Sequence, residues 1–410
     1  MLEIARPSAI GFDPARIERV YARLTEWTHE DKLPGAGIAI GRHGKLLEPR
    51  VFGRQRPDLS SPAMREDAIF LIASPTKPIT VTAAMLLVER GEIELDDPVV
   101  EYVPEFAPHG KDKIRVRHLM THTSGLPDQL PENLKLRAEH APLDAFVRGT
   151  CELKPDFEPG SAVQYQSMGI ATLAEIVRRV SGRPLRDFLR GEMFQPLGLK
   201  DTELGAPDDW WTGSGGSAPK TDRVAHVRVP QELADKDWNW NGRYWRSFGA
   251  PWGGLLTSPR EFAVICQLFL DALKGEGPTQ RLGKGDFGFG QQPGRAAPSL
   301  TLHSQPSTLL SPAAARAMAT NQLQFMASVP EADRRTRPWG LGWRLNWPSH
   351  SASFGDLLGP RAFGHWGATG TLVWIDPDAN AFLVLFTTQP QEPEGRYLAR
   401  ISNMVCAAIV

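Results

Sequence analysis

The residues best suited to chemistry are a serine and a lysine three positions apart, Ser74 and Lys77. They stand between an apolar run at 68–73 and a helix-forming run at 81–91. Because residues three apart share one face of a helix, we expect the hydroxyl and the amine side by side at a helix start. A serine alcohol is a weak nucleophile at neutral pH, and a neighbouring amine can act as its base or proton carrier. Taken alone, Ser74 would fit an ordinary helix N-cap equally well.

The same S-x-x-K spacing recurs at Ser217 and Lys220, in a stretch rich in glycine and serine. No helical pattern follows this second copy, so nothing in the sequence fixes the geometry of the two side chains. We therefore interpret it as coincidence and take Ser74 as the candidate nucleophile.

Two further segments supply the other groups that such a nucleophile needs. Tyr165 and Ser167 precede a long helical pattern at 168–181, where a phenol can reach across a cleft. Residues 364–370 read Gly-His-Trp-Gly-Ala-Thr-Gly and run into an apolar strand. Small residues beside a strand let a substrate approach the backbone N–H groups that can bind a developing oxyanion. Taken alone, Tyr165 would fit an ordinary packing role, and the glycines of 364–370 would fit a β-bulge.

Hydrophobic periodicity predicts the elements that position these residues. Helices are expected at 13–31, directly after Ser74, at 168–181, at 259–273 and at 394–409, with mainly helical structure over 92–200. Strands are expected in a hairpin at 36–53, just before Ser74, and at 339–347, 370–375 and 381–387. Residues 275–308, rich in Gly, Pro and Ser, are expected to form a long surface excursion.

Strands at both ends of the chain and helices in the middle predict an α+β fold. We expect one antiparallel sheet built from both chain ends and flanked by helices, with a mainly helical lobe beside it. The predicted sheet domain takes residues 1–75 and 335–410, and the helical domain takes 76–334 with an irregular, Trp-rich segment at 205–250. Ser74 then lies where the two parts meet, at the edge of a cleft.

Three motifs in one order, S-x-x-K, Y-x-S and H-x-G, resemble the class C β-lactamase-related serine hydrolases. That group includes class C β-lactamases, serine DD-peptidases, D-aminopeptidases and family VIII esterases, and it implies a β-lactamase/transpeptidase-like fold. The resemblance runs from about residue 30 to residue 390. The segments that carry it are 72–78, 94–99, 117–126, 157–160, 194–199 and 364–370.

The resemblance implies a role for each matching residue. Ser74 is the acyl-accepting nucleophile, Lys77 shuttles or stores a proton, and Tyr165 is the acid or base for attack and leaving group. Which of Lys77 and Tyr165 acts as the base stays open. The backbone N–H groups of Ser74 and Ala368 form the oxyanion hole. The residues expected to contact the substrate are Gln129, Ser167, His365, Trp366 and Gly367.

Two departures from the class C β-lactamase pattern bear on the substrate. His365 and Trp366 stand where those enzymes carry a lysine and a threonine that contact a substrate carboxylate, and histidine is mostly neutral at pH 7. Ser167 replaces an asparagine that holds the substrate amide. Both changes favour an esterase for small, uncharged carboxylic esters. The alternatives are a D-amino-acid peptidase/DD-carboxypeptidase or weak β-lactamase, and, outside the enzymes, a silent scaffold or ligand sensor.

Composition excludes several other classes. The net charge of −1 and the absence of a basic stripe argue against a nucleic-acid partner. No apolar run approaches the ~20 residues of a membrane span, and the N-terminus lacks a signal-peptide h-region. Three distant cysteines form neither a disulfide framework nor a metal site, which favours the cytoplasm. Acyl transfer through serine needs no cofactor, and the expected partner is a small ester or amide; the sequence predicts no oligomeric state.

Tryptophans crowd the irregular segment and its flank. Half of the 12 tryptophans stand between positions 210 and 252. They either anchor a loop to the surface or form an apolar rim over the cleft, and the sequence favours neither. The six are Trp210, Trp211, Trp238, Trp240, Trp245 and Trp252.

Overall fold

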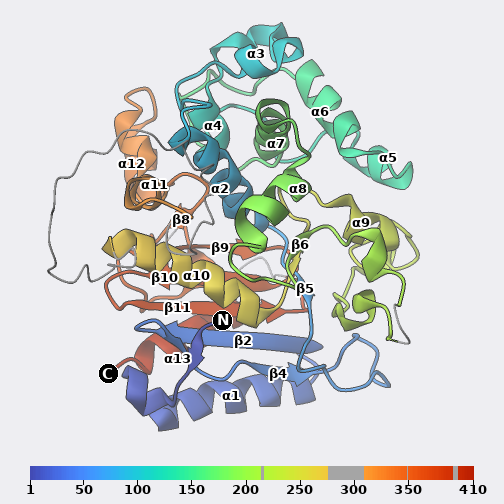
Figure 1. The fold of residues 1–410 in the computed structure, drawn as a ribbon, viewed down its shortest axis with the longest axis vertical. Coiled ribbons are helices and arrows are strands. Elements are labelled where there is room, and N and C mark those ends of the chain that lie inside the picture. The colour runs from blue at the N-terminus through green and yellow to red at the C-terminus, as the bar shows by residue number, and fades with distance from the viewer. Residues whose placement is uncertain (214–216, 276–308, 349, 391–395) are drawn as a thin grey trace, which may run out of the picture.

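A computed structural model of the chain describes residues 1–213, 217–275, 309–348, 350–390 and 396–410. From residue 276 on, the predicted excursion lies outside the described residues. An eight-stranded sheet runs through the structure in the order β1-β3-β2-β11-β10-β9-β8, with β4 paired to β2 (Figure 1). Its strands are β1 (Glu3–Ile4), β2 (Gly35–Arg42), β3 (Lys45–Leu46), β4 (Arg50–Gly53), β8 (Arg344–Leu345), β9 (Phe363–Gly367), β10 (Thr371–Asp376) and β11 (Ala381–Thr387).

The two ends of the chain meet at the centre of this sheet. Strand β2 pairs with β11 in antiparallel register, from Ala36 opposite Thr387 to Arg42 opposite Ala381. Every other pairing in the sheet is antiparallel too, except the short parallel contact of β1 with β3. This confirms the predicted α+β fold with a sheet assembled from both chain ends.

Both faces of the sheet are covered, as strand β11 shows. Its alternate side chains point to opposite faces. Phe382 and Val384 join the core that also contains α10 (Pro259–Lys274), whereas Leu383 and Leu385 join the core formed with α1 (Pro14–His29) and α13 (Arg396–Ala407). The sheet therefore lies between two helical layers, with α1 and α13 together below it in Figure 1.

The predicted long helices form where their sequences carry start and stop signals. The Asp13 carboxylate accepts the Arg16 N–H at 3.0 Å to cap α1, and the Ser258 hydroxyl accepts the Glu261 N–H at 3.2 Å to cap α10. Helix α7 (Met168–Ser181) ends at Gly182, whose φ of 69° a glycine adopts without strain. The predicted helices at 13–31, 168–181 and 259–273 are confirmed, and α13 confirms the one predicted at 394–409 over its described part, from Arg396 on.

The helical part is organised around α2 (Thr76–Glu89), which follows Ser74 directly. It is buried from Thr76 to Leu87 and packs against α7. The other α-helices are α3 (Val99–Tyr102), α4 (Val116–Met120), α5 (Asn133–Ala138), α6 (Leu143–Glu152), α8 (Leu185–Leu189), α9 (Arg243–Phe248), α11 (Pro312–Met318) and α12 (Glu331–Thr336). Short helical turns are η1 (Pro7–Ile10), η2 (Pro104–Phe106), η3 (Pro108–Lys113), η4 (Arg190–Phe194), η5 (Asp208–Trp210), η6 (Lys220–Arg223), η7 (Gln231–Leu233), η9 (Gln322–Phe325) and η10 (Ala352–Phe354).

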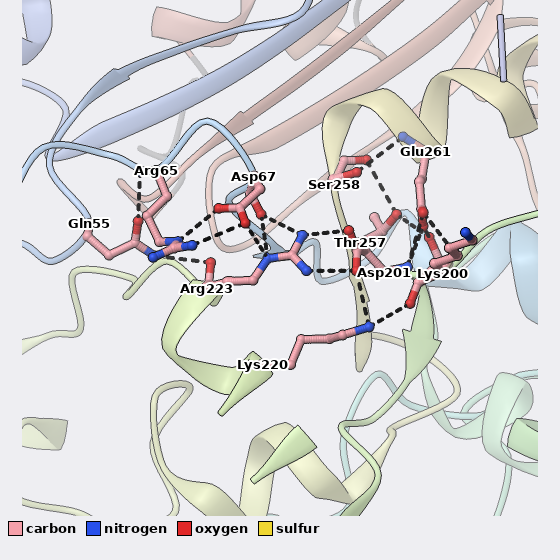
Figure 2. Close-up of polar contacts among 11 residues, drawn as sticks. Gln55, Arg65, Asp67, Lys200, Asp201, Lys220, Arg223, Thr257, Ser258 and Glu261 are labelled. Atoms are coloured by element: carbon pink, nitrogen blue, oxygen red, sulfur yellow. Dashed lines mark hydrogen bonds and ion pairs between the residues drawn. The ribbon is translucent and has the colours of Figure 1, made fainter. Parts of the chain in front are cut away.

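A second, three-stranded sheet leads into the Ser74 turn. Strand β7 (Leu255–Thr257) pairs with both β5 (Phe70–Leu71) and β6 (Glu203–Leu204). Hydrogen bonds and ion pairs connect the segments beside this sheet, as Figure 2 shows. Arg223 forms ion pairs with Asp67 at 3.0 Å and with Asp201 at 2.5 Å, so it joins the segments that precede β5 and β6.

Three features differ from the predicted elements. The strand expected at 339–347 shrinks to β8, whereas β9, which the glycines of 364–370 concealed, forms a five-residue ladder with β10. Helix α10, which the predicted boundaries assign to the helical domain, packs on strands of the large sheet.

In the described part of the chain, no helix combines the length and apolarity that crossing a bilayer requires.

Candidate active site

The Ser74 turn connects β5 to α2 under backbone strain. Ala73 has a φ of 52°, a left-handed conformation that is unusual for a residue with a Cβ. Thr76 holds this turn in place, because its hydroxyl donates to the Ala73 carbonyl at 2.6 Å and accepts the Leu255 N–H at 3.1 Å. The strained turn leaves the partly buried Ser74 at the start of the helix.

Lys77 points its amine at Ser74. The side chain is 1% exposed, and Nζ lies 3.3 Å from Ser74 Oγ and 3.1 Å from the Trp252 carbonyl oxygen. Both of these hydrogen-bond partners are neutral oxygens. The geometry agrees with the predicted pairing of hydroxyl and amine on one face of α2.

Tyr165 lies beside this pair and between two cationic side chains. Its ring centroid is 4.6 Å from Lys77 Nζ and 5.1 Å from the guanidinium carbon of Arg344. The ring of His122 packs against it at 4.8 Å. The Tyr165 hydroxyl is buried and has no hydrogen-bond partner among the described residues, so it can donate to or accept from a reacting group.

Arg344 and His365 form a buried layer behind Tyr165. Burial lowers the pKa of Arg344 to about 10, which still leaves the guanidinium charged at neutral pH. Burial, with the charges of Arg344 and Lys77, holds the pKa of His365 well below its usual range, so this histidine is neutral. His365 Nδ1 lies 2.7 Å from the Trp366 carbonyl oxygen.

The turn after β9 docks on the Ser74 turn. The Thr369 hydroxyl donates to the Leu71 carbonyl at 2.8 Å, and the Thr371 hydroxyl donates to the Ile72 carbonyl at 2.6 Å. A Cβ at Gly367 would lie 2.4 Å from the Ile72 carbonyl oxygen, so only glycine permits this approach. The close docking holds Ala368, which follows Gly367, at the cavity that Ser74 lines.

Ser74 and Ala368 present free backbone donors. Neither backbone N–H donates a hydrogen bond to an acceptor in the described ranges. Both residues line the same cavity. Two free N–H groups beside a nucleophile can hold the negative oxygen of a tetrahedral intermediate.

This cavity collects the candidate residues from remote parts of the chain. Its volume is about 140 Å³, which suits a small substrate group. Ser74, Lys77, Tyr165 and Ala368 all line it. The remaining lining residues are Leu71, Ala73, Asp128, Gln129, Arg137, Ser167, Trp240, Trp245, Trp252 and Gly253.

The residues expected to contact the substrate divide into two groups. Ser167 and Gln129 line the cavity, where the Ser167 hydroxyl donates to Asp128 Oδ1 at 2.5 Å. His365, Trp366 and Gly367 do not line it: His365 is fully buried, and Trp366 packs under the Arg344 guanidinium at 4.7 Å. Their substrate-binding roles stay predictions.

The Trp-rich segment contributes to the cavity through only part of its tryptophans. Trp240, Trp245 and Trp252 form one wall of the cavity. Trp210, Trp211 and Trp238 pack elsewhere, so both interpretations of this segment hold for half of its members. Sequence reasoning missed Asp128, which directly precedes Gln129, and Arg137, which stands eight residues after Gln129 at helical spacing.

Two other sequence signals lead away from chemistry. Lys220 pairs with Asp201 at 3.2 Å, which agrees with reading the second S-x-x-K copy as coincidence. His118 and His122 stand four positions apart, as zinc ligands can, but each accepts a backbone N–H through Nδ1, at 3.1 and 3.2 Å, as structural histidines do. Nowhere in the described ranges do three or more His, Cys, Asp or Glu side chains gather as they would around a metal ion.

Comparison with known proteins identifies the family of the chain. Residues 17–403 match the family model described as Beta-lactamase. Esterase EstB of Burkholderia gladioli is 35% identical over 211 residues, which cover 48% of this chain and 53% of the esterase. A putative D-alanyl-D-alanine carboxypeptidase of Salmonella enteritidis is 24% identical over 96% of this chain and 87% of its own.

A solved structure has the same fold. The structure titled "EstCE1, a hydrolase with promiscuous acyltransferase activity" superposes with a TM-score of 0.69 at 20% identity, covering 96% of this chain and 98% of that one. The family model spans nearly the whole chain, including the two motifs around Ser74 and Tyr165 and the strand that ends at Gly367. The chain therefore belongs to the β-lactamase family.

Proposed function

We propose that this serine hydrolase of the β-lactamase family forms an acyl-enzyme on Ser74 and hydrolyses small carboxylic esters. The observation that carries the proposal is the 3.3 Å approach of Lys77 Nζ to Ser74 Oγ inside a cavity that Tyr165 also lines. A scaffold or ligand sensor has no need for a strained serine turn, a buried amine and a free phenol at one point.

The reaction proceeds in two halves. Ser74 Oγ attacks the ester carbonyl carbon while its proton passes to the Lys77–Tyr165 pair, and the N–H groups of Ser74 and Ala368 stabilise the oxyanion. The C–O bond to the alcohol breaks, the alcohol leaves with that proton, and the acyl group stays on Ser74. Water then attacks the acyl carbon and gives a proton to the same pair. The C–O bond to Ser74 Oγ breaks, Oγ takes up that proton, and the carboxylic acid leaves. Lys77 and Tyr165 both line the cavity beside Ser74, with Lys77 Nζ 4.6 Å from the Tyr165 ring centroid, so we assign the base to the pair.

Cavity chemistry supports an ester over an amide. Ser167, at the position expected to hold a substrate amide, already donates its hydroxyl to Asp128. Neutral, buried His365 offers no cation to a carboxylate next to the scissile bond. The similarity to Esterase EstB supports the same choice, whereas the similarity to the carboxypeptidase supports hydrolysis of D-amino-acid peptides as the second candidate.

A substrate panel separates these activities. Purified protein is assayed against p-nitrophenyl acetate and butyrate, D-alanine p-nitroanilide and nitrocefin, each with Ser74→Ala as the blank. We expect kcat/KM to be highest for the esters. Faster turnover of nitrocefin or of the anilide than of either ester would contradict the proposed substrate class, and no turnover of any compound would support the scaffold.

We also propose that the protein works in the cytoplasm. Cys151, Cys266 and Cys406 are unpaired thiols, two of them buried. Free, distant cysteines agree with the reducing cytoplasm expected from the sequence.

A further inference from the structure

An arginine from α5 reaches the wall of the catalytic cavity without a role in the chemistry above. Arg137 lines the cavity together with Trp245, and its guanidinium carbon lies 4.1 Å above the Trp245 ring. Its Nε donates to Asn133 Oδ1 at 3.2 Å. Planar stacking on one side and a hydrogen bond on the other fix the plane of the guanidinium.

The hydrogen bonds that hold Arg137 extend to Gln129, another residue that lines the cavity. The Asn133 amide donates to Gln129 Oε1 at 2.7 Å, so Gln129, Asn133 and Arg137 form one chain of hydrogen bonds along successive turns. Asn133 and Trp245 are both buried, at 4% and 3% exposure. The guanidinium is therefore held before any substrate arrives, which lowers the entropy cost of binding to it.

Most of the donors of Arg137 are unused. An arginine has five N–H groups, and only the Nε group of Arg137 donates to a described residue. No described carboxylate forms an ion pair with it, whereas Arg54, Arg190 and Arg223, which are partly buried too, each have at least one. Its two terminal nitrogens are not sealed in protein, because neither is among the fully buried polar atoms. They remain open to a molecule in the cavity.

Arg137 keeps its positive charge, and the charged side chains that line the cavity favour an anionic ligand. Burial lowers the pKa of Arg137 to about 10, which leaves it cationic at neutral pH. Among the described residues that line the cavity, Lys77 and Arg137 are basic and Asp128 is the single carboxylate. Asp128 is engaged by the Ser167 hydroxyl and is not ion-paired with Arg137.

We propose that Arg137 binds a carboxylate on the ester substrate, at a position away from the scissile carbonyl. The proposal rests on the proposed esterase function and specifies its substrates as small esters that carry an acidic group, in place of the uncharged esters that the sequence favours. Two parallel N–H donors of a guanidinium match the two oxygens of a carboxylate. The partly desolvated setting strengthens that pairing relative to one at the open surface.

Matched ester pairs test the proposal on either side of the scissile bond. One pair is 4-nitrophenyl hydrogen adipate and its methyl ester, which places the charge on the acyl part. The other is 4-acetoxybenzoate and its methyl ester, which places the charge on the alcohol part. The measured quantity is the ratio of kcat/KM for the charged ester to that for the uncharged ester, in the wild type, Arg137→Gln and Arg137→Lys.

We expect the ratio for at least one pair to fall about 10- to 100-fold in Arg137→Gln, as for a lost charge-assisted hydrogen bond, through a raised KM. Arg137→Lys should show a smaller fall in this ratio, because lysine keeps the positive charge but lacks the two parallel N–H donors of a guanidinium. Arg148→Gln, which removes an exposed arginine of α6, is the control for overall charge and should leave the ratio unchanged.

An unchanged ratio in Arg137→Gln for both pairs would overturn the inference and leave Arg137 as a packing partner of Trp245. An equal fall in Arg148→Gln would overturn it too, because the effect would then come from net charge. If the wild type hydrolyses none of the four esters, the proposed function itself fails; hydrolysis that is insensitive to Arg137 leaves that function intact.

Discussion

At the scale of single residues, the reactivity of Ser74 depends on two side chains that the protein has desolvated. Lys77 is 1% exposed and its amine is directed by two neutral oxygens. Tyr165 has an unpaired, buried hydroxyl, and its ring lies near the Lys77 amine and the Arg344 guanidinium. An unpaired polar group in a buried site costs stability, so its retention at this point agrees with a use in proton transfer.

Tyr165→Phe separates the catalytic use of the hydroxyl from a structural one. We expect kcat/KM to fall about 10²- to 10⁴-fold, the usual range for loss of an acid or base. The free energy of unfolding should stay equal or rise slightly, because the hydroxyl lost has no partner. Ester assays and urea denaturation check the two halves of the prediction.

Tyr102→Phe is the matched control, since the Tyr102 hydroxyl donates to the Asp97 carboxylate far from the cavity. That change should lower stability by about 1 kcal/mol and leave kcat/KM unaltered. A Tyr165→Phe enzyme with wild-type activity would remove Tyr165 from the mechanism.

The sequence predicts that Ser74, Lys77 and Tyr165 share a site, because the spacing within each motif and the order of the motifs can be read directly along the chain. It does not predict Arg137 or Arg344, whose importance comes from what packs against them. Arg137 matters because it stacks on Trp245, more than a hundred residues later in the chain. Arg344 matters because its guanidinium carbon lies 5.1 Å from the Tyr165 ring and stays charged at neutral pH, although burial lowers its pKa to about 10.

At the scale of elements, the site depends on the docking of β9 against the Ser74 turn. His365 and Trp366 are expected to contact substrate, and this stays a prediction: neither lines the cavity, since His365 is fully buried and Trp366 packs against the core formed with α1 and α13. Strand β9 was concealed in the sequence because its glycines have low strand propensity. Those glycines are instead required by the close approach of neighbouring backbone, which no local pattern reports.

Gly367→Ala tests this docking. The added Cβ would meet the Ile72 carbonyl and the Thr371 hydroxyl at 2.4 Å, so the turn that carries Ala368 must shift away from Ser74. We expect a loss of about 1–3 kcal/mol in unfolding free energy, as for overpacking, and at least a tenfold fall in kcat. Thermal denaturation and single-turnover acylation measure the two effects.

The control is Gly191→Ala in η4, where the nearest atom to an added Cβ is the flexible end of Arg183 at 3.3 Å. It should leave both quantities near those of the wild type. A Gly367→Ala protein that acylates at the wild-type rate would show that the position of the β9 turn does not matter for catalysis.

At the scale of the whole molecule, the two chain ends build the large sheet, and an ion-pair network joins the segments beside the second sheet. The hydrophobic pattern predicts the sheet because β2 and β11 are continuous apolar runs with both faces buried. It does not predict that Arg223 joins Asp67 and Asp201 across the second sheet, since surface charges carry no periodic signal (Figure 2).

Arg223→Ala should lower the unfolding free energy by about 1–3 kcal/mol at pH 7. Although burial opposes it, the Arg223 guanidinium holds the pKa of Asp201 below its usual value. A carboxyl whose pKa is lowered in the folded state contributes stability above its unfolded pKa of about 4, and that contribution is lost as pH falls through the folded pKa. The difference between variant and wild type should therefore shrink below pH 4 in urea titrations.

Arg361→Ala provides the comparison, because its ion pair with Asp378 is exposed at 72% and 39%. We expect it to change stability by no more than about 0.5 kcal/mol. If Arg223→Ala is equally mild at pH 7, the network in Figure 2 does not fasten the second sheet.

The central claim is that one alcohol, Ser74 Oγ, takes up the acyl group. Intact-mass spectrometry after incubation with a fluorophosphonate ester, followed by peptide mapping, measures this directly on the wild type, Ser74→Ala and Ser217→Ala. The account predicts a single adduct on Ser74 in the wild type and in Ser217→Ala, and none in Ser74→Ala. An adduct that persists in Ser74→Ala, or that maps to another serine of the wild type, would contradict it.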